Sequence, residues 1–390
     1  MDIFLFFKTL ADMFYAVPVF DYLLLIVAIA FFIVALRNIE EYYPIDYLVF
    51  AFMIMLSITF VRSFSGFDHY IKMLSAFMLY FIGRGYNYDI EKVKNALVKS
   101  YTIVLLLHIL LFLLGIGFIN WGNSLTFRGL YYFKTDFSMA MIFAISTIVF
   151  LTRIPVKYKI LTWIIIEYLI IRSNTRAALL ISFIVFGIWL ISIREELTGA
   201  KITINIKYVV WVLLGLFVGI ILLTKILSLP VFEKYSFISF KFNSLSELYS
   251  DANTQGRNHV WENIFKIYEN SSIVDKLVGI DYISDRWNGY DSHNGYLKIL
   301  FTTGIIGLGI FIGIIVIYIK ALNDIKDRCS FYFNISIIIS FLLASISQSS
   351  IDFTQMTWIV MFFIGNTISQ VSTCEQDKSS PTLIEDNFKD

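Results

Sequence analysis

Residues 97–119 read LVKSYTIVLLLHILLFLLGIGFI, an apolar run interrupted by only two basic side chains, Lys99 and His108. An α-helix of about 20 apolar residues crosses the roughly 30 Å hydrocarbon core of a bilayer. The whole 390-residue chain shares this character, because 58% of its residues are hydrophobic, 16% are charged and the mean hydropathy is +0.73. A soluble protein cannot bury so much apolar surface. The sequence therefore predicts an integral membrane protein built of helices, and the alternating strands of a β-barrel do not fit.

Apolar runs of similar length recur along the chain and predict about eleven transmembrane helices. Residues 1–19 contain Lys8, Asp12 and Pro18 among Phe and Leu, so they suit either an interfacial helix or a twelfth span. The expected fold is all-α, a polytopic membrane helix bundle of about 11–12 transmembrane helices with one long extracytoplasmic loop. The predicted spans are 20–36, 45–61, 68–83, 97–119, 136–152, 156–171, 177–193, 207–228, 295–319, 331–350 and 354–372.

Four parts follow from this pattern. Residues 1–228 hold the N-terminal transmembrane helices, and residues 229–294 form the long extracytoplasmic (periplasmic) loop. Residues 295–372 hold the C-terminal transmembrane helices, and residues 373–390, which are polar and contain Pro381, are predicted to form a cytoplasmic tail.

Basic residues gather in the short loops between these spans and predict the orientation of the chain. Short cytoplasmic loops of membrane proteins carry an excess of Lys and Arg. Counting spans outward from the basic loops places residues 120–135, 172–176 and 229–294 on the opposite, extracytoplasmic side. The basic residues used are Arg84, Lys92, Lys94, Lys99, Arg153, Lys157, Lys159, Arg194, Lys201, Lys207, Lys320, Lys326 and Arg328.

The long polar loop holds several candidate functional residues. Residues 256–261 read GRNHVW, and apolar residues that continue at helical spacing from Trp261 to Tyr268 predict an amphipathic helix lying on the membrane. The loop ends in DSHNGYL at residues 291–297, which places His293 at the mouth of the next apolar helix. This histidine can act as a base near neutral pH. Alternatively, Ser292 or Asn294 merely caps the helix.

A short polar link, IRSNTRAA at residues 171–178, lies on the same predicted face. If the link is helical, Arg172 and Arg176 lie on one side about 6 Å apart. Two guanidinium groups in that arrangement suit a phosphate between them. In the alternative interpretation, both side chains extend to lipid headgroups.

Several classes of chemistry have no supporting motif. The chain contains no Walker lysine motif, Gly-rich nucleotide loop, HExxH or CxxC, so neither a metal nor a cofactor is predicted. The net charge of +1 and the scattered basic residues give no nucleic-acid patch. Cys329 and Cys374 both fall in predicted cytoplasmic segments, so no disulfide is expected. His108 and Glu167 lie inside predicted spans, where ionisable groups are functional candidates, but each is isolated in the sequence, which favours a structural role within the bundle.

Three short motifs follow one another in a fixed order across residues 156–319. They are Ser-x-Thr-Arg-Ala at 173–177, Gly-Arg-x-x-x-Trp at 256–261 and Ser-His-Asn-x-x-Leu at 292–297, the last preceding a Gly-rich helix. In this order the motifs resemble the O-antigen ligase and O-antigen polymerase superfamily. The resemblance implies a metal-independent glycosyltransferase that uses an undecaprenyl-pyrophosphate-linked glycan on the outer face of the bacterial inner membrane.

The resemblance also implies roles for particular residues. Outer-face arginines hold the pyrophosphate, which matches Arg257 and Arg176, with Arg172 as the alternative to Arg176. His293 acts on the acceptor hydroxyl. On chemical grounds, apart from the resemblance, Asp291 or Asp285 is a candidate to orient its ring. The remaining substrate-binding candidates are His259, Trp261 and Tyr290. Tyr282, Trp287 and Tyr290 can stack on sugars or anchor the chain at the interface.

The function predicted from the sequence is polymerisation, the transfer of a lipid-linked glycan onto another lipid-linked repeat unit. The alternative is an O-antigen ligase that transfers the glycan to lipid A core. Transport, including a polysaccharide flippase, and a membrane scaffold are the rival classes. Expected partners are the undecaprenyl-pyrophosphate-linked oligosaccharide, the lipid bilayer, and the flippase and chain-length regulator of the same pathway.

Overall fold

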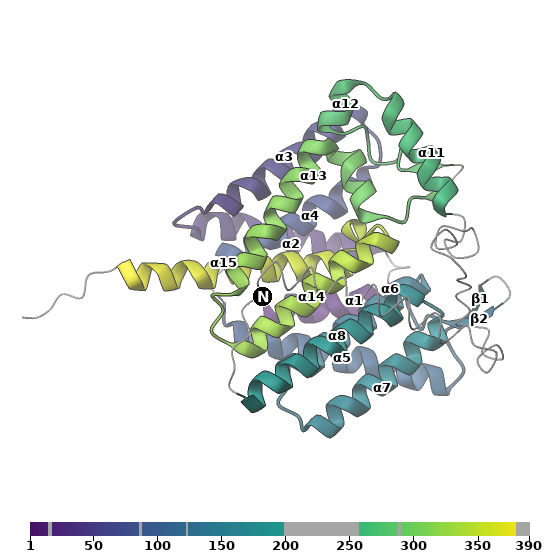
Figure 1. Cartoon of the computed structure of the whole chain (residues 1–390), viewed down its shortest axis with the longest axis vertical. Helices are drawn as coiled ribbons and strands as arrows, with labels where there is room; N and C mark the ends of the chain where they lie inside the picture. Colours follow the sequence, from purple (N-terminus) through teal and green to yellow (C-terminus); the bar gives the residue numbers. More distant parts are fainter. Residues whose placement is uncertain (15–17, 86–87, 122–123, 199–256, 288–289, 380–390) are drawn as a thin grey trace, which may run out of the picture.

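The computed structural model describes residues 1–14, 18–85, 88–121, 124–198, 257–287 and 290–379, which form a bundle of helices with two short antiparallel hairpins (Figure 1). The N-terminal part contains α1 (Asp2–Ala11), η1 (Asp12–Phe14), α2 (Pro18–Asn38), α3 (Pro44–Ser63), α4 (Phe67–Gly85), α5 (Ile90–Leu113), β1 (Phe118–Trp121), β2 (Ser124–Phe127), α6 (Lys134–Leu151), α7 (Val156–Ser173) and α8 (Arg176–Thr198). The C-terminal part contains α11 (Arg257–Asn270), α12 (Ile273–Val278), β3 (Arg286–Trp287), β4 (Tyr290–Asp291), α13 (Gly295–Leu322), α14 (Arg328–Ser347), η5 (Ser350–Asp352) and α15 (Thr354–Ser379).

Each predicted span within the described residues overlaps a helix, although the helix of span 295–319 is kinked at Gly304, and the predicted span 207–228 lies outside the described residues. Six of the described helices, α3, α5, α6, α8, α13 and α14, are long and apolar enough to cross a membrane. α4 and α7 fill predicted spans but carry more charged residues, such as Lys72 and Glu167. The helical fold fits an integral membrane protein, while the number of spans and the side of each loop remain predictions.

The structure corrects one predicted boundary and shows the length of the N-terminal helix, which the sequence left open. The expected span 97–119 ends at Leu113, because Gly115 and Gly117 adopt positive φ angles of 71° and 87° that an α-helix does not allow. The chain then forms β1 instead of continuing the helix. The N-terminal helix α1 has ten residues, which is about 15 Å of helix and too short to cross a bilayer. It packs against α5, and its buried Lys8 pairs with Asp12.

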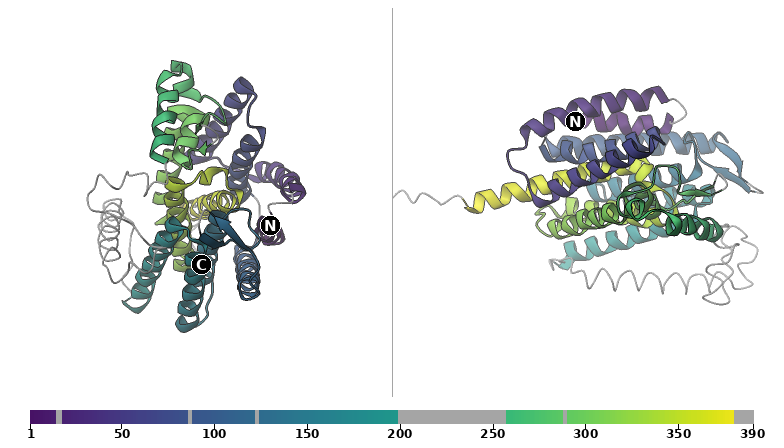
Figure 2. Two further views of the ribbon diagram at one scale, coloured as in Figure 1. Left: turned by 90° about the vertical axis from the view of Figure 1, so that its right-hand side faces the viewer. Right: turned by 90° about the horizontal axis from the view of Figure 1, so that it is seen from above.

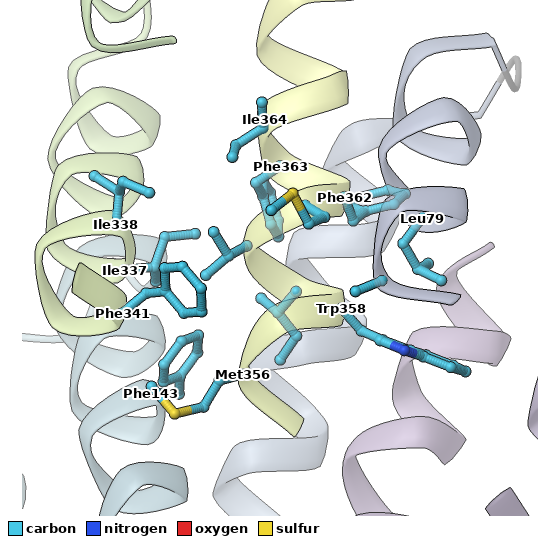
Figure 3. Close-up of a cluster of buried hydrophobic side chains, with 14 of the residues drawn as sticks. Leu79, Phe143, Ile337, Ile338, Phe341, Met356, Trp358, Phe362, Phe363 and Ile364 are labelled. Carbon is cyan, nitrogen blue, oxygen red and sulfur yellow. The ribbon is translucent and has the colours of Figure 1, made fainter. Parts of the chain in front are cut away.

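Helix α15 lies at the centre of the bundle, and its side chains from Trp358 to Phe363 are buried. A helix that is apolar around its whole circumference belongs in an interior. Figure 3 shows Leu79 from α4, Phe143 from α6 and Phe341 from α14 converging on this helix. Helices α4, α6 and α14 therefore pack around α15.

Glycines allow α4 and α15 to approach each other closely. A Cβ atom added at Gly83 would lie 2.1 Å from the carbonyl oxygen of Phe362, and one added at Gly365 would lie 1.9 Å from that of Tyr80. Both separations are far below van der Waals contact, so a side chain at either position forces the two backbones apart.

Ion pairs identify which helix ends lie together. Lys94 Nζ lies 3.1 Å from Asp327 at the start of α14, and Arg328 lies 2.6 Å from Glu195 near the end of α8. The start of α14 therefore meets the end of α8, and the two helices pack in opposite directions. The start of α8 consequently lies at the end of the bundle where α14 finishes. Figure 1 shows the β1–β2 hairpin and α11 at that same end, on the right, and Figure 2 shows the bundle from two further sides.

The substitution Gly365→Ala tests the close approach of α4 and α15. We expect the melting temperature of the detergent-solubilised protein to fall by several degrees, because the new methyl group collides with the α4 backbone. Gly187→Ala in α8 is the matched control, since a Cβ there has nothing within 4 Å. Equal melting temperatures for the two variants would show that α4 and α15 are not in close contact.

Candidate active site at one end of the bundle

The Ser292-His293-Asn294 segment is held firmly by its backbone and by the two polar side chains that flank the histidine. Ser292 is buried, its N–H donates to the Asp285 carbonyl at 2.9 Å, and its hydroxyl donates to the Asp285 carboxylate at 3.1 Å. Asn294 caps α13, because its side-chain oxygen accepts from the N–H groups of Tyr296 and Leu297 at 3.0 Å. The histidine between them is exposed. The segment thus both caps a helix and presents an imidazole at the surface.

His293 adopts a left-handed backbone conformation, with φ of 47°. This region costs a non-glycine residue about 1–2 kcal/mol, and such conformations concentrate at functional sites. Asp291 stabilises the turn by accepting the His293 backbone N–H at 3.0 Å and the Ser349 hydroxyl at 3.1 Å.

The two candidate carboxylates differ in their surroundings. The pKa of Asp291 is lowered below its usual range. Burial alone would raise this pKa, but its effect is outweighed by the hydrogen bond from the His293 N–H, the charges of Lys298 and His293, and the hydrogen bond from Ser349. Asp291 is therefore ionised beside His293. Asp285 is also buried, and this burial, together with the charge of Asp291, raises its pKa although Lys298 opposes the shift. The Asp285 carboxylate accepts hydrogen bonds from Ser292 and Lys298, whereas Asp291 contacts His293 itself. Asp291 is therefore the better candidate to influence the imidazole.

Helix α11 packs against the first turns of α13. Val260 and Ile264 pack against Phe301, and the indole N–H of Trp261 donates to the Ser292 carbonyl at 2.6 Å. The predicted amphipathic helix is present: Ile264 is buried against Phe301 of α13, while Phe265 and Ile267 of the same helix are exposed, so its position on the membrane stays a prediction. Trp261 ties α11 to the residue beside His293.

The structure describes the side chains of some of the remaining loop candidates and only the backbone of others. His259 is exposed on the first turn of α11, and Arg257 begins that helix. Tyr290 begins β4, but the side chains of Tyr290 and Arg257, like that of Trp287, lie outside the part that the structure describes. Tyr282 is fully buried and donates its hydroxyl to the Leu56 carbonyl at 2.7 Å, so neither alternative considered for it, stacking on a sugar or anchoring at the interface, fits its position.

The Arg172–Arg176 link is a break between two helices and not a continuous helix. Asn174 has a φ of 52° and ends α7, and α8 begins at Arg176. The predicted i, i+4 arrangement on one helix face is therefore wrong, because the left-handed residue between the arginines redirects the chain. Arg172 is exposed and Arg176 is half-buried.

Lys134 contacts the link between α7 and α8. This residue was not identified as a candidate from the sequence. Its ammonium donates to the Asn174 carbonyl at 3.4 Å, and Ser138, one turn later on α6, shares a 2.6 Å hydrogen bond with Ser173. α6 and α8 both begin at this end, so the partial positive charges of two helix N-termini add to three basic side chains. The position of Lys134 directly before a predicted span gave no signal for this contact. We define the cationic group as Lys134, Arg172 and Arg176.

The cationic group and His293 lie at the same end of the bundle. α14 ends near Gly295, whose N–H donates to the Gln348 carbonyl at 3.0 Å, and α8 begins at that end. Within the residues that the structure describes, no group of three or more His, Cys, Asp or Glu side chains is arranged to hold a metal ion.

A second residue that sequence reasoning missed is Lys298. It is fully buried in the first turns of α13 and lies 2.9 Å from Asp285. A lysine inside an apolar span is a functional signal in itself, but here it was counted as part of the span 295–319.

His108 and Glu167 have local partners, although one carboxylate oxygen of Glu167 is buried without a hydrogen-bond partner among the described residues. His108 Nδ1 lies 2.7 Å from the Val104 carbonyl and its ring stacks on Tyr131, while Ser182 donates to Glu167.

No protein-family model matches the chain, and no curated protein matches it at a significant level. The site must therefore be interpreted from its own geometry.

The backbone at His293 yields a stability prediction. His293→Gly is expected to keep or raise the melting temperature, because glycine adopts positive φ without strain. His293→Val is expected to lower it, since a β-branched residue fits this conformation poorly. If glycine destabilises the protein as much as valine does, the imidazole itself holds the loop in place.

Proposed function

We propose that the protein is a metal-independent glycosyltransferase of the bacterial inner membrane that polymerises a surface polysaccharide such as O-antigen from undecaprenyl-pyrophosphate-linked repeat units. The observation that carries this proposal is an exposed histidine, held in a strained turn beside an ionised aspartate, at the bundle end that also carries the cationic group. The order of the three sequence motifs supports it. The substrate would approach from the extracytoplasmic side.

The reaction needs a base and a charge-stabilising group. As the acceptor oxygen bonds to the anomeric carbon of the donor, the bond from that carbon to the phosphate oxygen breaks, and undecaprenyl pyrophosphate leaves. His293 would take the acceptor hydroxyl proton, and Asp291 would stabilise the imidazolium that results. Arg176 and Arg257, together with Arg172 and Lys134, would neutralise the charge that develops on the leaving phosphate.

The acceptor would lie between α11 and the His293 turn. His259 on the first turn of α11 and Trp261, which already bonds to Ser292, flank this region. Tyr290 begins the strand that leads into Asp291. These residues are proposed to contact the acceptor sugar. A ligase acting on lipid A core would use the same donor residues and differ only in its acceptor.

Deletion of the gene, followed by complementation, tests the function in the native host. A gel ladder of surface polysaccharide from the deletion strain should collapse to core carrying a single repeat unit. Wild type should restore the ladder, while His293→Ala, Arg176→Ala and Arg257→Ala should fail at matched membrane levels. Arg153→Ala, an exposed arginine before α7 at the opposite end, is the control and should restore it. Naked core with polymer stranded on its carrier would indicate the ligase, and an unchanged ladder would refute both.

Lys134→Ala tests the contribution of the third cation. A lost charge-assisted contact to the pyrophosphate costs about 1.5–3 kcal/mol, so kcat/KM for the lipid-linked donor should fall roughly 10–100-fold. The measurement is the initial rate of polymer formation with purified protein in nanodiscs. Arg153→Ala again serves as the control. Wild-type kcat/KM in Lys134→Ala would remove this lysine from the donor site.

A further inference from the structure

A connected row of charged side chains, which includes the buried Lys298 and Asp285, lies next to the turn that carries His293. The Lys298 ammonium on α13 is fully buried, 2.9 Å from Asp285 and 3.8 Å from Asp352, and it donates to the Tyr282 carbonyl at 2.5 Å. A buried cation is tolerated only where opposite charges and hydrogen bonds compensate for its lost hydration. Lys298 therefore ties the loop to η5.

The row continues to helix α4 through Asp352. One oxygen of Asp352 lies 3.0 Å from His69 Nδ1, and the other oxygen is buried with no hydrogen-bond partner among the described residues. Asp352 thus joins Lys298 and His69, which come from different helices. An incompletely bonded carboxylate beside a lysine keeps negative charge close to it.

The row also continues outward to the turn that carries His293. Asp285 accepts from the Ser292 hydroxyl at 3.1 Å, and the same hydroxyl lies 3.3 Å from the Asp291 carboxylate. Asp291 in turn holds the His293 N–H. A continuous set of hydrogen bonds and ion pairs therefore connects the Lys298 ammonium with the backbone of His293.

We propose that Lys298 is a positioning residue for His293, which holds the strained turn through Asp285 and Ser292 and offsets the negative charge of the carboxylates around the imidazole. Its catalytic meaning rests on the proposed function, but its effect on His293 does not. Among the side chains that the structure describes, the charged and titratable groups of this region include Asp291 from β4, Asp285 from the loop, Lys298 from α13, Asp352 from η5, Asp68 and His69 from α4, and His259 and Glu262 from α11.

The test measures His293 directly, without assuming any enzyme activity. Full-length protein in nanodiscs is treated with diethyl pyrocarbonate across a pH series, and the modification of each histidine is followed by mass spectrometry. The reagent attacks the neutral imidazole, so the rate at each pH gives a titration midpoint. The exposed His259 is the internal reference, and the buried His108 reports unfolding.

Lys298→Met removes a positive charge while keeping the length of the side chain. The surroundings of His293 become more negative, which favours the imidazolium, so its midpoint should rise by about half a pH unit or more. Asp352→Asn removes a negative charge and should lower the midpoint. The midpoint of His259 should stay unchanged in both variants. Lys320→Met, on the exposed far end of α13, is the matched control and should leave His293 unaltered.

Two outcomes would overturn the inference. The first is an unchanged midpoint and rate at His293 in Lys298→Met. The second is a folded Asp352→Asn variant in which the His293 midpoint does not fall. This variant decides the question if Lys298→Met shows a parallel change at His259 and new reactivity at His108, which indicate loss of folding.

Failure of the proposed function gives a different pattern. His293 would then shift as expected in Lys298→Met, while the polysaccharide ladder of the host would not change when the gene is deleted. A shift at His293 accompanied by loss of the ladder in Lys298→Met, but not in Lys320→Met, would support both proposals.

Discussion

Within a bilayer, every backbone N–H and C=O group must be bonded inside the protein, and this constraint shapes the whole chain. The long apolar segments meet it by forming helices, so most non-helical backbone lies between them, and α13 is interrupted by a kink at Gly304, whose φ is 65°. The positive-φ residues Asn174 and His293 both lie at helix boundaries. The segments free to adopt special conformations are therefore those that carry the arginines and the histidine.

The central packing depends on the same constraint. Between helices in lipid, close contact of backbones replaces the hydrophobic effect as a source of stability. Gly83 and Gly365 allow such contact between α4 and α15, and the aromatic residues around Phe362 fill the remaining space. A rigid centre of this kind can support a strained turn at its end, because η5 precedes α15 directly and carries Asp352.

Much of the fold follows from sequence, because the length and composition of an apolar run specify a helix almost independently of its neighbours. Candidate residues such as His293 and Trp261 were found from short motifs near the ends of those runs. Features that depend on tertiary contacts were not found. The break at Asn174, the contact from Lys134, the burial of Tyr282 and the role of Lys298 each depend on a partner far away in the chain. Lys298 was predicted to be part of an ordinary span because nothing local identifies Asp285 and Asp352 as its counter-charges.

The placement of ionisable groups also bears on transport as the rival function. A transporter with alternating access binds its solute near the midplane of the bilayer, between pseudo-symmetric halves. Among the described residues, His108 bonds to the Val104 carbonyl one turn earlier, and Glu167 accepts from Ser182 on the adjacent helix. In the part of the chain that the structure describes, neither contact leads on to another acidic or basic side chain, although one carboxylate oxygen of Glu167 is buried without a hydrogen-bond partner. The connected charges, from His69 through Lys298 to Asp291, instead run across one end of it. That arrangement suits chemistry at a membrane surface better than passage of a solute through the bundle.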